Sequence, residues 1–293
     1  MDDQEVFQQD LSQEQTYGAV FVINLLFREP VEMPEQDVMT SVMERRVGNV
    51  ECFWRTENGT GYVAKDYLAQ FKDGALPPQL AVMPCTSFDG AKLGTFERSQ
   101  MWDFAGDRDR VLDECKYVVM ATDMMAAVLQ PKERAALDMD FLEALVELYP
   151  SCEAVLIHSC SKLLSPDTIR NHTLTREQRF IKFAVNARFF NIQGTEDMMV
   201  DTLGMGILFL PDLQYHFHGM DPNWVVQHAY CTADYILSAD NPIKSGDPID
   251  GIVDGRFTPE VRWRCRYEDA LIQPMREVID ICMNEYAAGK RNE

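Results

Sequence analysis

Residues 261–267 carry the pattern that most constrains the fold of this chain. Four apolar residues alternate there with three arginines: Val261, Trp263, Cys265 and Tyr267 with Arg262, Arg264 and Arg266. Successive side chains of a β-strand point to opposite faces. The segment is therefore predicted to be a strand with one buried face and one solvated face.

The other patterns predict strands and helices in an irregular order. Strands are expected at 18–27, 50–55, 80–83, 117–121, 154–158 and 180–192, and helices from Pro34, Pro131, Asp221 and Pro274. This order indicates an α+β fold, with mixed or mainly antiparallel sheets and helices packed on one face. No P-loop or dinucleotide-binding glycine motif is present. We expect an N-terminal subdomain over 1–125 and a second domain over 126–293, with one continuous domain as the alternative.

The net charge of −20 bears on the partners of the protein. Binding to nucleic acid or to an anionic membrane normally depends on clustered Lys and Arg, which an acidic chain lacks. No run of about eighteen apolar residues suggests a membrane span. We therefore expect neither nucleic acid nor membrane as a partner. A basic protein fits the charge, and a homo-oligomer is left open.

The cysteines and the first residues favour a cytoplasmic location. None of the eight cysteines forms a C-x-x-C pair, and most lie in apolar segments. Residues 1–15 are acidic and contain no basic region that leads into an apolar run, as a secretory signal would. We expect the thiols to stay reduced, as small core side chains.

The densest polar cluster spans residues 212–218. In a strand, Asp212, Gln214, His216 and His218 would share one face. Two imidazoles two residues apart can bind one metal ion, and a nearby carboxylate can complete the ligand set. The cluster therefore predicts a divalent-metal site at His216, His218 and Asp212, with hydrogen bonding on a sheet face as the alternative. No other cofactor is indicated.

The remaining nearby histidines are expected to be structural. The helix that begins at Asp221 should pack His228 against the apolar face of the sheet, opposite to His216 and His218. His158 lies within an apolar strand segment and is interpreted in the same way.

A catalytic cleft is a second interpretation of the same region. Lys182, Asn186 and Arg188 would lie beside the 212–218 cluster if the two predicted strands are neighbours. In such a cleft Arg188 would hold an anionic group, and His216 and His218 would transfer protons with Asp212 close by. The alternative is a solvated sheet face that ion pairs cross-link.

The three arginines of residues 261–267 could bind a ligand. Guanidinium groups recognise carboxylate and phosphate in a bidentate manner, so Arg262, Arg264 and Arg266 are candidate ligand-binding residues. The alternative is that they pair with the surplus of Asp and Glu in the chain.

Several motifs resemble a bacterial family known only as domain of unknown function 4261, most clearly over residues 137–254. The motifs are Arg179–Asn186, Arg188–Thr195, Val200–Gly204, Leu210–His218, Tyr235, Ile243–Asp247 and Ile249–Gly251. The resemblance implies a bacterial, cytoplasmic α+β protein. It assigns no reaction, cofactor or site residue.

Two hypotheses about function follow. The first is a non-catalytic binding or regulatory protein of the immunity type, whose acidic surface covers a basic partner. The second is an enzyme of unfamiliar type, a metal-dependent or histidine acid–base hydrolase with its cleft around His216 and His218. The sequence decides neither whether the protein is an enzyme nor which strands are neighbours.

Overall fold

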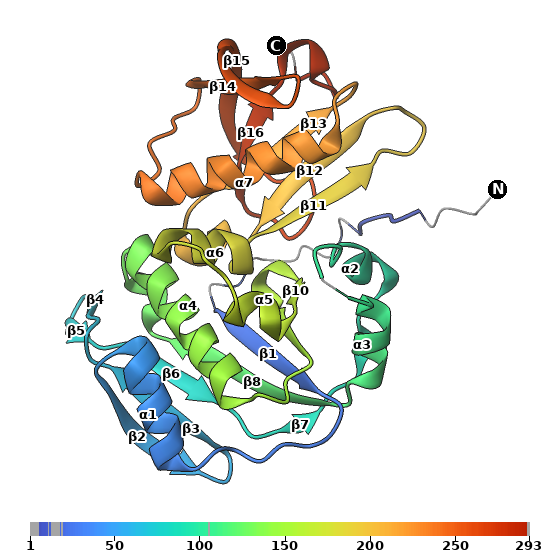
Figure 1. The fold of residues 1–293 in the computed structure, drawn as a ribbon. Coiled ribbons are helices and arrows are strands. Elements are labelled where there is room, and N and C mark those ends of the chain that lie inside the picture. Colours follow the sequence, from blue (N-terminus) through green and yellow to red (C-terminus); the bar gives the residue numbers. More distant parts are fainter. Residues whose placement is uncertain (1–5, 11, 13–17, 19, 105, 292–293) are drawn as a thin grey trace. The chain divides into compact units, whose positions relative to one another are not determined.

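An eight-stranded sheet and a six-stranded sheet organise the chain in the computed structural model, which describes residues 6–10, 12, 18, 20–104 and 106–291 (Figure 1). Each sheet belongs to its own unit. The N-terminal unit is Ala19–Ala184, and the C-terminal unit combines Met1–Gly18 with Val185–Glu293. The α+β prediction is confirmed, because strands and helices are mixed and nearly all strand pairs are antiparallel.

The sheet of the N-terminal unit is entirely antiparallel. Its strand order is β10(Lys162–Leu164)-β9(Ala154–Ile157)-β1(Val22–Phe27)-β8(Tyr117–Met124)-β6(Gln79–Val82)-β3(Gly59–Ala64)-β2(Val50–Thr56), with β7(Thr86–Ser87) paired to β8. A separate hairpin consists of β4(Ala69–Phe71) and β5(Gly74–Leu76). The predicted boundary at residue 125 is wrong, because β1 pairs with β8 on one side of that residue and with β9 on the other.

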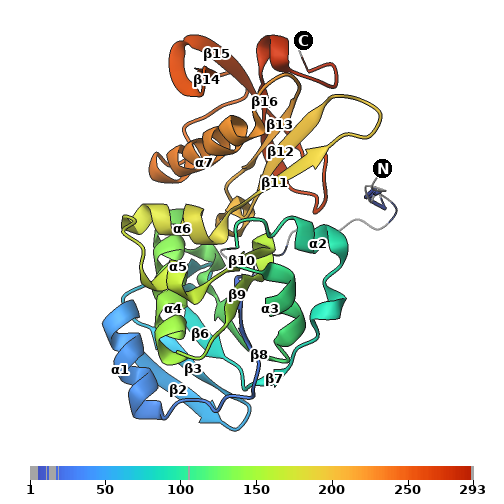
Figure 2. The same ribbon diagram turned by 45° about the vertical axis from the view of Figure 1, so that its right-hand side comes forward.

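Helices cover both faces of this sheet, and the expectation of helices on one face is wrong for this unit. Tyr62 and Asp123 share one face, where they bond Thr40 of α1(Gln36–Val47) and Arg134 of α4(Pro131–Leu148). Leu26 shares the opposite face with Leu156 and packs in one core cluster with Leu112 of α3(Arg108–Glu114). The remaining helices are α2(Thr95–Ser99), α5(Pro166–Arg170) and α6(Arg176–Ala184). Figure 2 shows α1, α4 and α6 on the same side.

The C-terminal unit has one long helix on one face of its sheet. The strand order is β11(Asn186–Asn191)-β12(Met198–Leu203)-β13(Asp212–Phe217)-β16(Glu277–Cys282)-β15(Arg256–Asp269)-β14(Pro248–Val253). Only β13 and β16 pair in parallel among these strands. The helix is α7(Pro222–Ser238), which lies in front of the sheet in Figure 1. β14 is an edge strand of this sheet.

Short 3₁₀ helices complete the list of elements. They are η1(Gly90–Lys92), η2(Ala126–Val128), η3(His158–Cys160), η4(Met205–Leu208) and η5(Asn284–Tyr286).

Two predicted elements have the wrong type. The strand expected at 180–192 is helix α6 followed by strand β11. Phe180, Ile181, Phe183 and Ala184 are all buried, which is the spacing of one helix face and not of a strand. The helix expected from Pro274 is strand β16, which lies between two other strands and is buried on both faces from 278 to 281. Adjacent apolar residues such as Val278 and Ile279 are typical of such a central strand.

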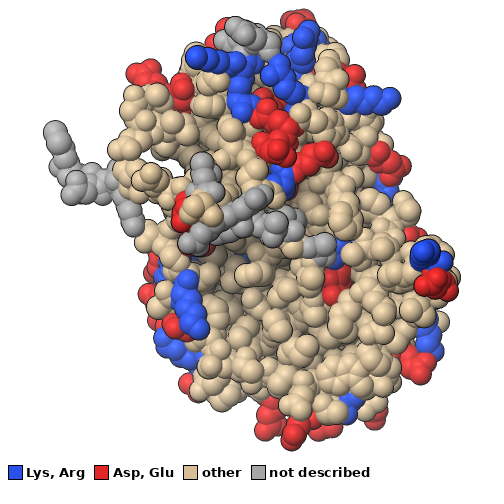
Figure 3. Space-filling view, turned by 180° about the vertical axis from the view of Figure 1, so that it is seen from behind, with Lys and Arg blue, Asp and Glu red and all other residues tan. Residues whose placement is uncertain are grey.

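The arginine-alternating segment at 261–267 is confirmed as part of a half-buried strand, β15. Trp263 and Cys265 are fully buried, whereas Arg262, Arg264 and Arg266 are exposed. Figure 3, seen from behind, shows Lys and Arg side chains gathered at the upper end, over the part of the molecule that contains β15. A broad area lower in this view has few charged side chains.

Helices capable of spanning a bilayer are not found among the described residues. All eight cysteines are free thiols.

Candidate functional site

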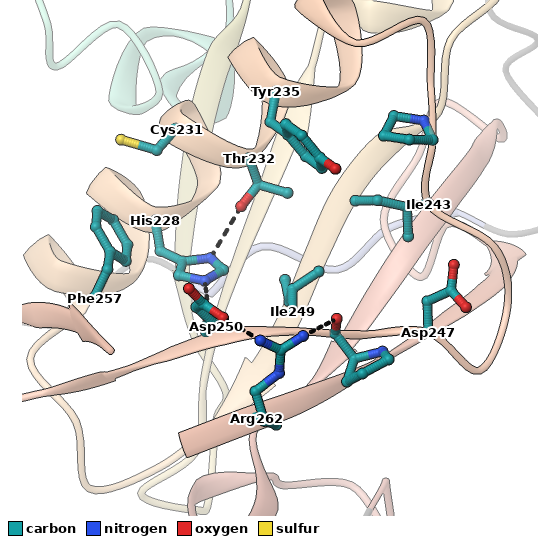
Figure 4. A pocket seen from close by; sticks show the side chains of 12 residues that line it. His228, Cys231, Thr232, Tyr235, Ile243, Asp247, Ile249, Asp250, Phe257 and Arg262 are labelled. Carbon is teal, nitrogen blue, oxygen red and sulfur yellow. Dashed lines mark hydrogen bonds and ion pairs between the residues drawn. The ribbon is translucent and has the colours of Figure 1, made fainter. Parts of the chain in front are cut away.

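A pocket of about 500 Å³ lies between α7 and the edge strand β14 of the C-terminal unit (Figure 4). We call it the α7 pocket. Helix α7 contributes His228, Thr232 and Tyr235 to its wall, and β14 contributes Ile249 and Asp250. A concave site of this size, lined by apolar groups with a few polar ones, is typical of ligand-binding sites.

The start of α7 is fixed by local sequence. The carboxylate of Asp221 accepts a hydrogen bond from the Asn223 backbone N–H at 2.9 Å, and Pro222 occupies the first helical position. A capping carboxylate and a proline at this position both favour helix initiation. The predicted helix start is confirmed. His228 is buried on this helix, whereas Cys231 and Tyr235 are exposed.

The segment between α7 and β14 turns back toward the sheet. Asp240 and Asn241 both adopt positive φ values directly after the helix, a conformation that Asp and Asn tolerate better than most residues. The Asp247 carboxylate then accepts the Lys244 backbone N–H at 2.8 Å. This turn places Ile243 and Asp247 on the pocket wall.

The pairing of β14 with β15 is irregular beside the pocket wall. The pairing of β14 with β15 shifts its register between Asp250 and Gly251. A Cβ atom at Gly251 would lie 2.9 Å from Nε1 of the Trp263 indole, so a larger side chain would displace that ring. The additional residues lie on β15 between Thr258 and Arg262, and bulges of this kind often occur next to binding sites.

His228 joins α7 to two strands. Its Nδ1 lies 2.8 Å from the Tyr215 hydroxyl of β13, and its Nε2 lies 2.8 Å from the carbonyl oxygen of Asp250 in β14. Nε2–H therefore donates to the carbonyl, and Nδ1 is left to accept from the hydroxyl. Burial lowers the pKa of His228 to about 4. The prediction of a buried, hydrogen-bonded His228 on the apolar face is confirmed.

The charged groups of the pocket lie along its β14 side. Arg262 forms an ion pair with the Asp250 carboxylate and donates to the Pro248 carbonyl oxygen at 2.8 Å. Both partners of the ion pair are nearly half exposed. Asp247 is half-buried. Of the three predicted ligand-binding arginines, Arg262 thus lines the pocket, whereas Arg264 and Arg266 are exposed elsewhere on β15.

The structure also links Arg188 and Asp212, but inside a buried network and not in a cleft. Arg188 donates to the Asp201 carboxylate at 2.8 Å, and Arg276 donates to the same carboxylate at 2.7 Å. Arg276 also donates to Asp212 at 3.1 Å. All four side chains are buried. The alternative to a catalytic cleft was a solvated sheet face that ion pairs cross-link. The structure shows the ion pairs, but this face is buried and not solvated.

Asp212 has further partners that fix it in place. Its carboxylate accepts the Thr202 hydroxyl at 2.8 Å and the Met205 backbone N–H at 3.2 Å. Burial raises the pKa of Asp212, which Arg276 opposes. Gln214, the next residue on this face, bonds Glu268 and Asp280. These polar side chains bind one another and hold the 270–276 segment over the sheet.

The two histidines of the predicted metal site lie apart from this network. His216 is half-buried, with Nε2 3.7 Å from an Asp197 carboxylate oxygen, and burial lowers its pKa. His218 is exposed. Within the part of the chain that the structure describes, no three His, Cys, Asp or Glu side chains group in a way that could hold a metal ion. The structure thus does not bring His216, His218 and Asp212 together as a ligand set.

Two other predictions about single residues are wrong. Lys182 lies on α6 in the N-terminal unit, 3.6 Å from Asp103, and not on a strand beside Asn186 and Arg188. Asn186 is buried at the start of β11. His158 is exposed, because β9 ends at Ile157 and the chain turns there.

Comparison with known proteins points to the C-terminal unit. Residues 201–282 match the family model described as Domain of unknown function (DUF4261), which confirms the resemblance inferred from the motifs. No curated protein and no solved structure matches the chain. The matched segment contains every residue that lines the α7 pocket.

Proposed function

We propose that this protein is a non-catalytic binding protein of the bacterial cytoplasm, and that its C-terminal unit holds part of a basic protein partner in the α7 pocket. The observation that supports this proposal is the pocket itself. It is large enough for one or two side chains, and its wall combines apolar residues with polar groups at the rim. The free thiols and the net charge of −20 fit a reducing compartment and a basic partner.

The polar groups of the pocket suit binding better than proton transfer. Both nitrogens of His228 are hydrogen-bonded, and with a pKa of about 4 the ring is neutral at pH 7 and a weak base. Although Cys231 is exposed as a residue, its thiol is partly removed from water, and this desolvation together with Asp234 raises its pKa, so little of the nucleophilic thiolate is present. In Figure 4 the Cys231 side chain also points away from the centre of the pocket.

A pocket-filling variant with a matched control tests the proposal. Ile249 points into the pocket in Figure 4, so Ile249→Trp should fill it. Val253 lies on the same strand, is exposed, and does not line the pocket, so Val253→Trp adds the same ring elsewhere. Partners captured by the wild-type protein would be identified, purified and retested one by one.

The expected partner is basic, binds the wild type and the Val253→Trp variant equally, and loses at least about tenfold in affinity for Ile249→Trp. Its affinity should also fall between about 50 mM and about 500 mM salt, because salt screens the attraction. A partner that binds Ile249→Trp as tightly as wild type, or whose affinity ignores salt, would contradict the proposal.

A further inference from the structure

We infer that the α7 pocket selects ligands that combine an apolar body with a cationic group, and that Asp247 receives the cation. This inference rests on the proposed function, because it names the ligand class of the same site. A lysine or arginine side chain of a protein has this chemistry, and an arylalkylamine imitates it.

The apolar body of the ligand has a defined place. Ile243 is buried, and Ile249 reaches up from β14 into the middle of the pocket (Figure 4). The rings of Tyr235 and Phe257 are each about half exposed and stand at the rim. A hydrocarbon chain that lies against these aromatic rings and the apolar floor removes apolar surface from water, which stabilises the complex. The faces of aromatic rings also attract a cation.

The charges of the pocket leave one carboxylate without a cation. Arg262 and Asp250 neutralise each other. Among the described residues, Asp247 accepts a hydrogen bond from the Lys244 backbone N–H but forms no ion pair with a Lys, Arg or His side chain. Asp247 therefore gives the pocket a net negative charge, and the cation of a bound ligand would form an ion pair with its carboxylate.

An anionic ligand is disfavoured by the same geometry. Among the described residues that line the pocket, Arg262 alone is a Lys or Arg, and its Nη1 and Nη2 already donate to the Asp250 carboxylate and the Pro248 carbonyl oxygen. An anion would have to remove Arg262 from Asp250 and leave two carboxylates exposed beside it. The net charge of −20 would also repel that anion at long range.

Three probes with one apolar body test the inference. Phenethylamine, phenethyl alcohol and hydrocinnamate share a phenethyl group and differ in a cationic, neutral or anionic end. Ligand-observed NMR titration of the full chain would measure their affinities. The amine should bind about fivefold tighter than the alcohol, as one half-exposed ion pair allows, and the carboxylate should bind most weakly.

Variants of two carboxylates locate the cation. Asp247→Asn keeps an acceptor for the Lys244 N–H but removes the charge, so the amine should fall to the affinity of the alcohol. Asp254→Asn is the control, because Asp254 is exposed in the β14–β15 turn and outside the pocket wall. Arg262→Gln should tighten amine binding, since it frees the Asp250 carboxylate. Thermal unfolding would verify that each variant is folded.

The two possible failures can be told apart. If none of the probes binds, or if Ile249→Trp binds all of them as well as wild type does, the pocket is not a binding site and the proposed function fails with the inference. If Ile249→Trp abolishes binding but the alcohol or the carboxylate binds wild type as tightly as the amine, the pocket stands and the cation assignment is overturned. Unchanged amine affinity in Asp247→Asn would also overturn it.

Discussion

His228 shows how burial fixes the state of one side chain. The centroid of its ring lies 4.9 Å from that of the Trp263 ring and 5.3 Å from that of the Phe257 ring. Both of its nitrogens form hydrogen bonds. The sequence predicted this role correctly, because the position of His228 on an amphipathic helix faces the sheet. His158 failed the same argument, since its apolar neighbours did not reveal that the strand ends one residue earlier.

The pKa of His228 predicts a loss of stability in mild acid. The folded protein holds this pKa at about 4, below its ordinary value of 6.5, so protonation favours the unfolded chain. Stability is complete above pH 6.5 and should fall as the pH drops toward 4, by up to about 3 kcal/mol from this residue.

Urea unfolding of wild type and His228→Gln between about pH 7 and about pH 4.5 measures this effect. The variant should be less stable at pH 7 because the Tyr215 hydroxyl and the Asp250 carbonyl lose their partner. Its stability should change less with pH than that of wild type. Parallel pH curves for the two proteins would contradict the assignment.

Asp138 is a buried acid of the N-terminal unit. It is fully buried in α4, and among the described residues neither of its oxygens has a hydrogen-bond donor. Arg134 lies 3.8 Å away and bonds Asp123 more closely. Burial, together with the nearby Asp123, raises the pKa of Asp138 well above its ordinary value. The proton therefore stabilises the folded form, and stability from this group declines as the pH rises from about 4 toward the raised pKa.

Replacing Asp138 with leucine should stabilise the protein at neutral pH by about 1–3 kcal/mol, because an unsatisfied polar group leaves the core. Glu44→Leu, on an exposed position of α1, should change stability by less than about 0.5 kcal/mol. Chemical denaturation compares the two. A destabilised Asp138→Leu variant would show that this carboxyl has partners that matter.

At the level of elements, local patterns identified the strands that border solvent and failed for those that do not. β15 alternates visibly because one of its faces is exposed. β16 is buried on both faces, so Val278, Ile279 and Ile281 show no alternation that would distinguish a strand from a helix. Helix α6 ends at Ala184 and strand β11 begins at Asn186. Together their residues show the alternation of a single strand, which is why one strand was predicted over 180–192.

The candidate site was only partly predictable for a related reason. Arg262 was singled out as a ligand-binding residue, and Tyr235, Asp247 and Asp250 lie in the motifs that carry the family resemblance. Nothing local shows that α7 packs beside β14, because that contact depends on strand order. The H-x-H spacing at 216–218 points to β13 and the residue after it, and these two histidines do not line the α7 pocket.

Arg276 connects two elements of the C-terminal unit and should be hard to replace. It donates to Asp201 and Asp212, and also to the carbonyl oxygens of Ile272 and Pro274 in the segment before β16. Arg276→Met would leave two buried carboxylates with a single guanidinium. We expect a loss of about 3–5 kcal/mol in the free energy of unfolding.

Arg264→Met is the matched control for this prediction, because Arg264 lies on the same sheet but is exposed. Its effect should stay within about 0.5 kcal/mol. Guanidinium chloride unfolding of both variants gives the comparison, and a loss below about 1 kcal/mol for Arg276→Met would show that the network adds little to stability.

At the scale of the whole molecule, the division into units could not be read from the sequence. β9 follows α4 along the chain and then pairs with β1, more than a hundred residues earlier. Pairings of this kind leave no local signal. The predicted boundary at residue 125 thus cut through a continuous sheet.

The observed division predicts that residues 19–184 fold alone. This segment holds every strand of the eight-stranded sheet and the helices on both of its faces. Expressed by itself, it should show one cooperative urea transition by circular dichroism. A fragment ending at residue 125 lacks β9, β10 and α4 and should remain unfolded. Cooperative folding of the shorter fragment would contradict the division.

The contacts of the first described residues have a consequence for how the protein is made. Gln9 donates to the Leu271 carbonyl oxygen and accepts from the Gln273 backbone N–H, across 262 and 264 positions of sequence. At about 5–20 residues per second, a ribosome needs roughly 15–50 seconds to synthesise the intervening chain. The N-terminal unit can fold during that interval, while Gln9 has to wait until Leu271 and Gln273 have been synthesised.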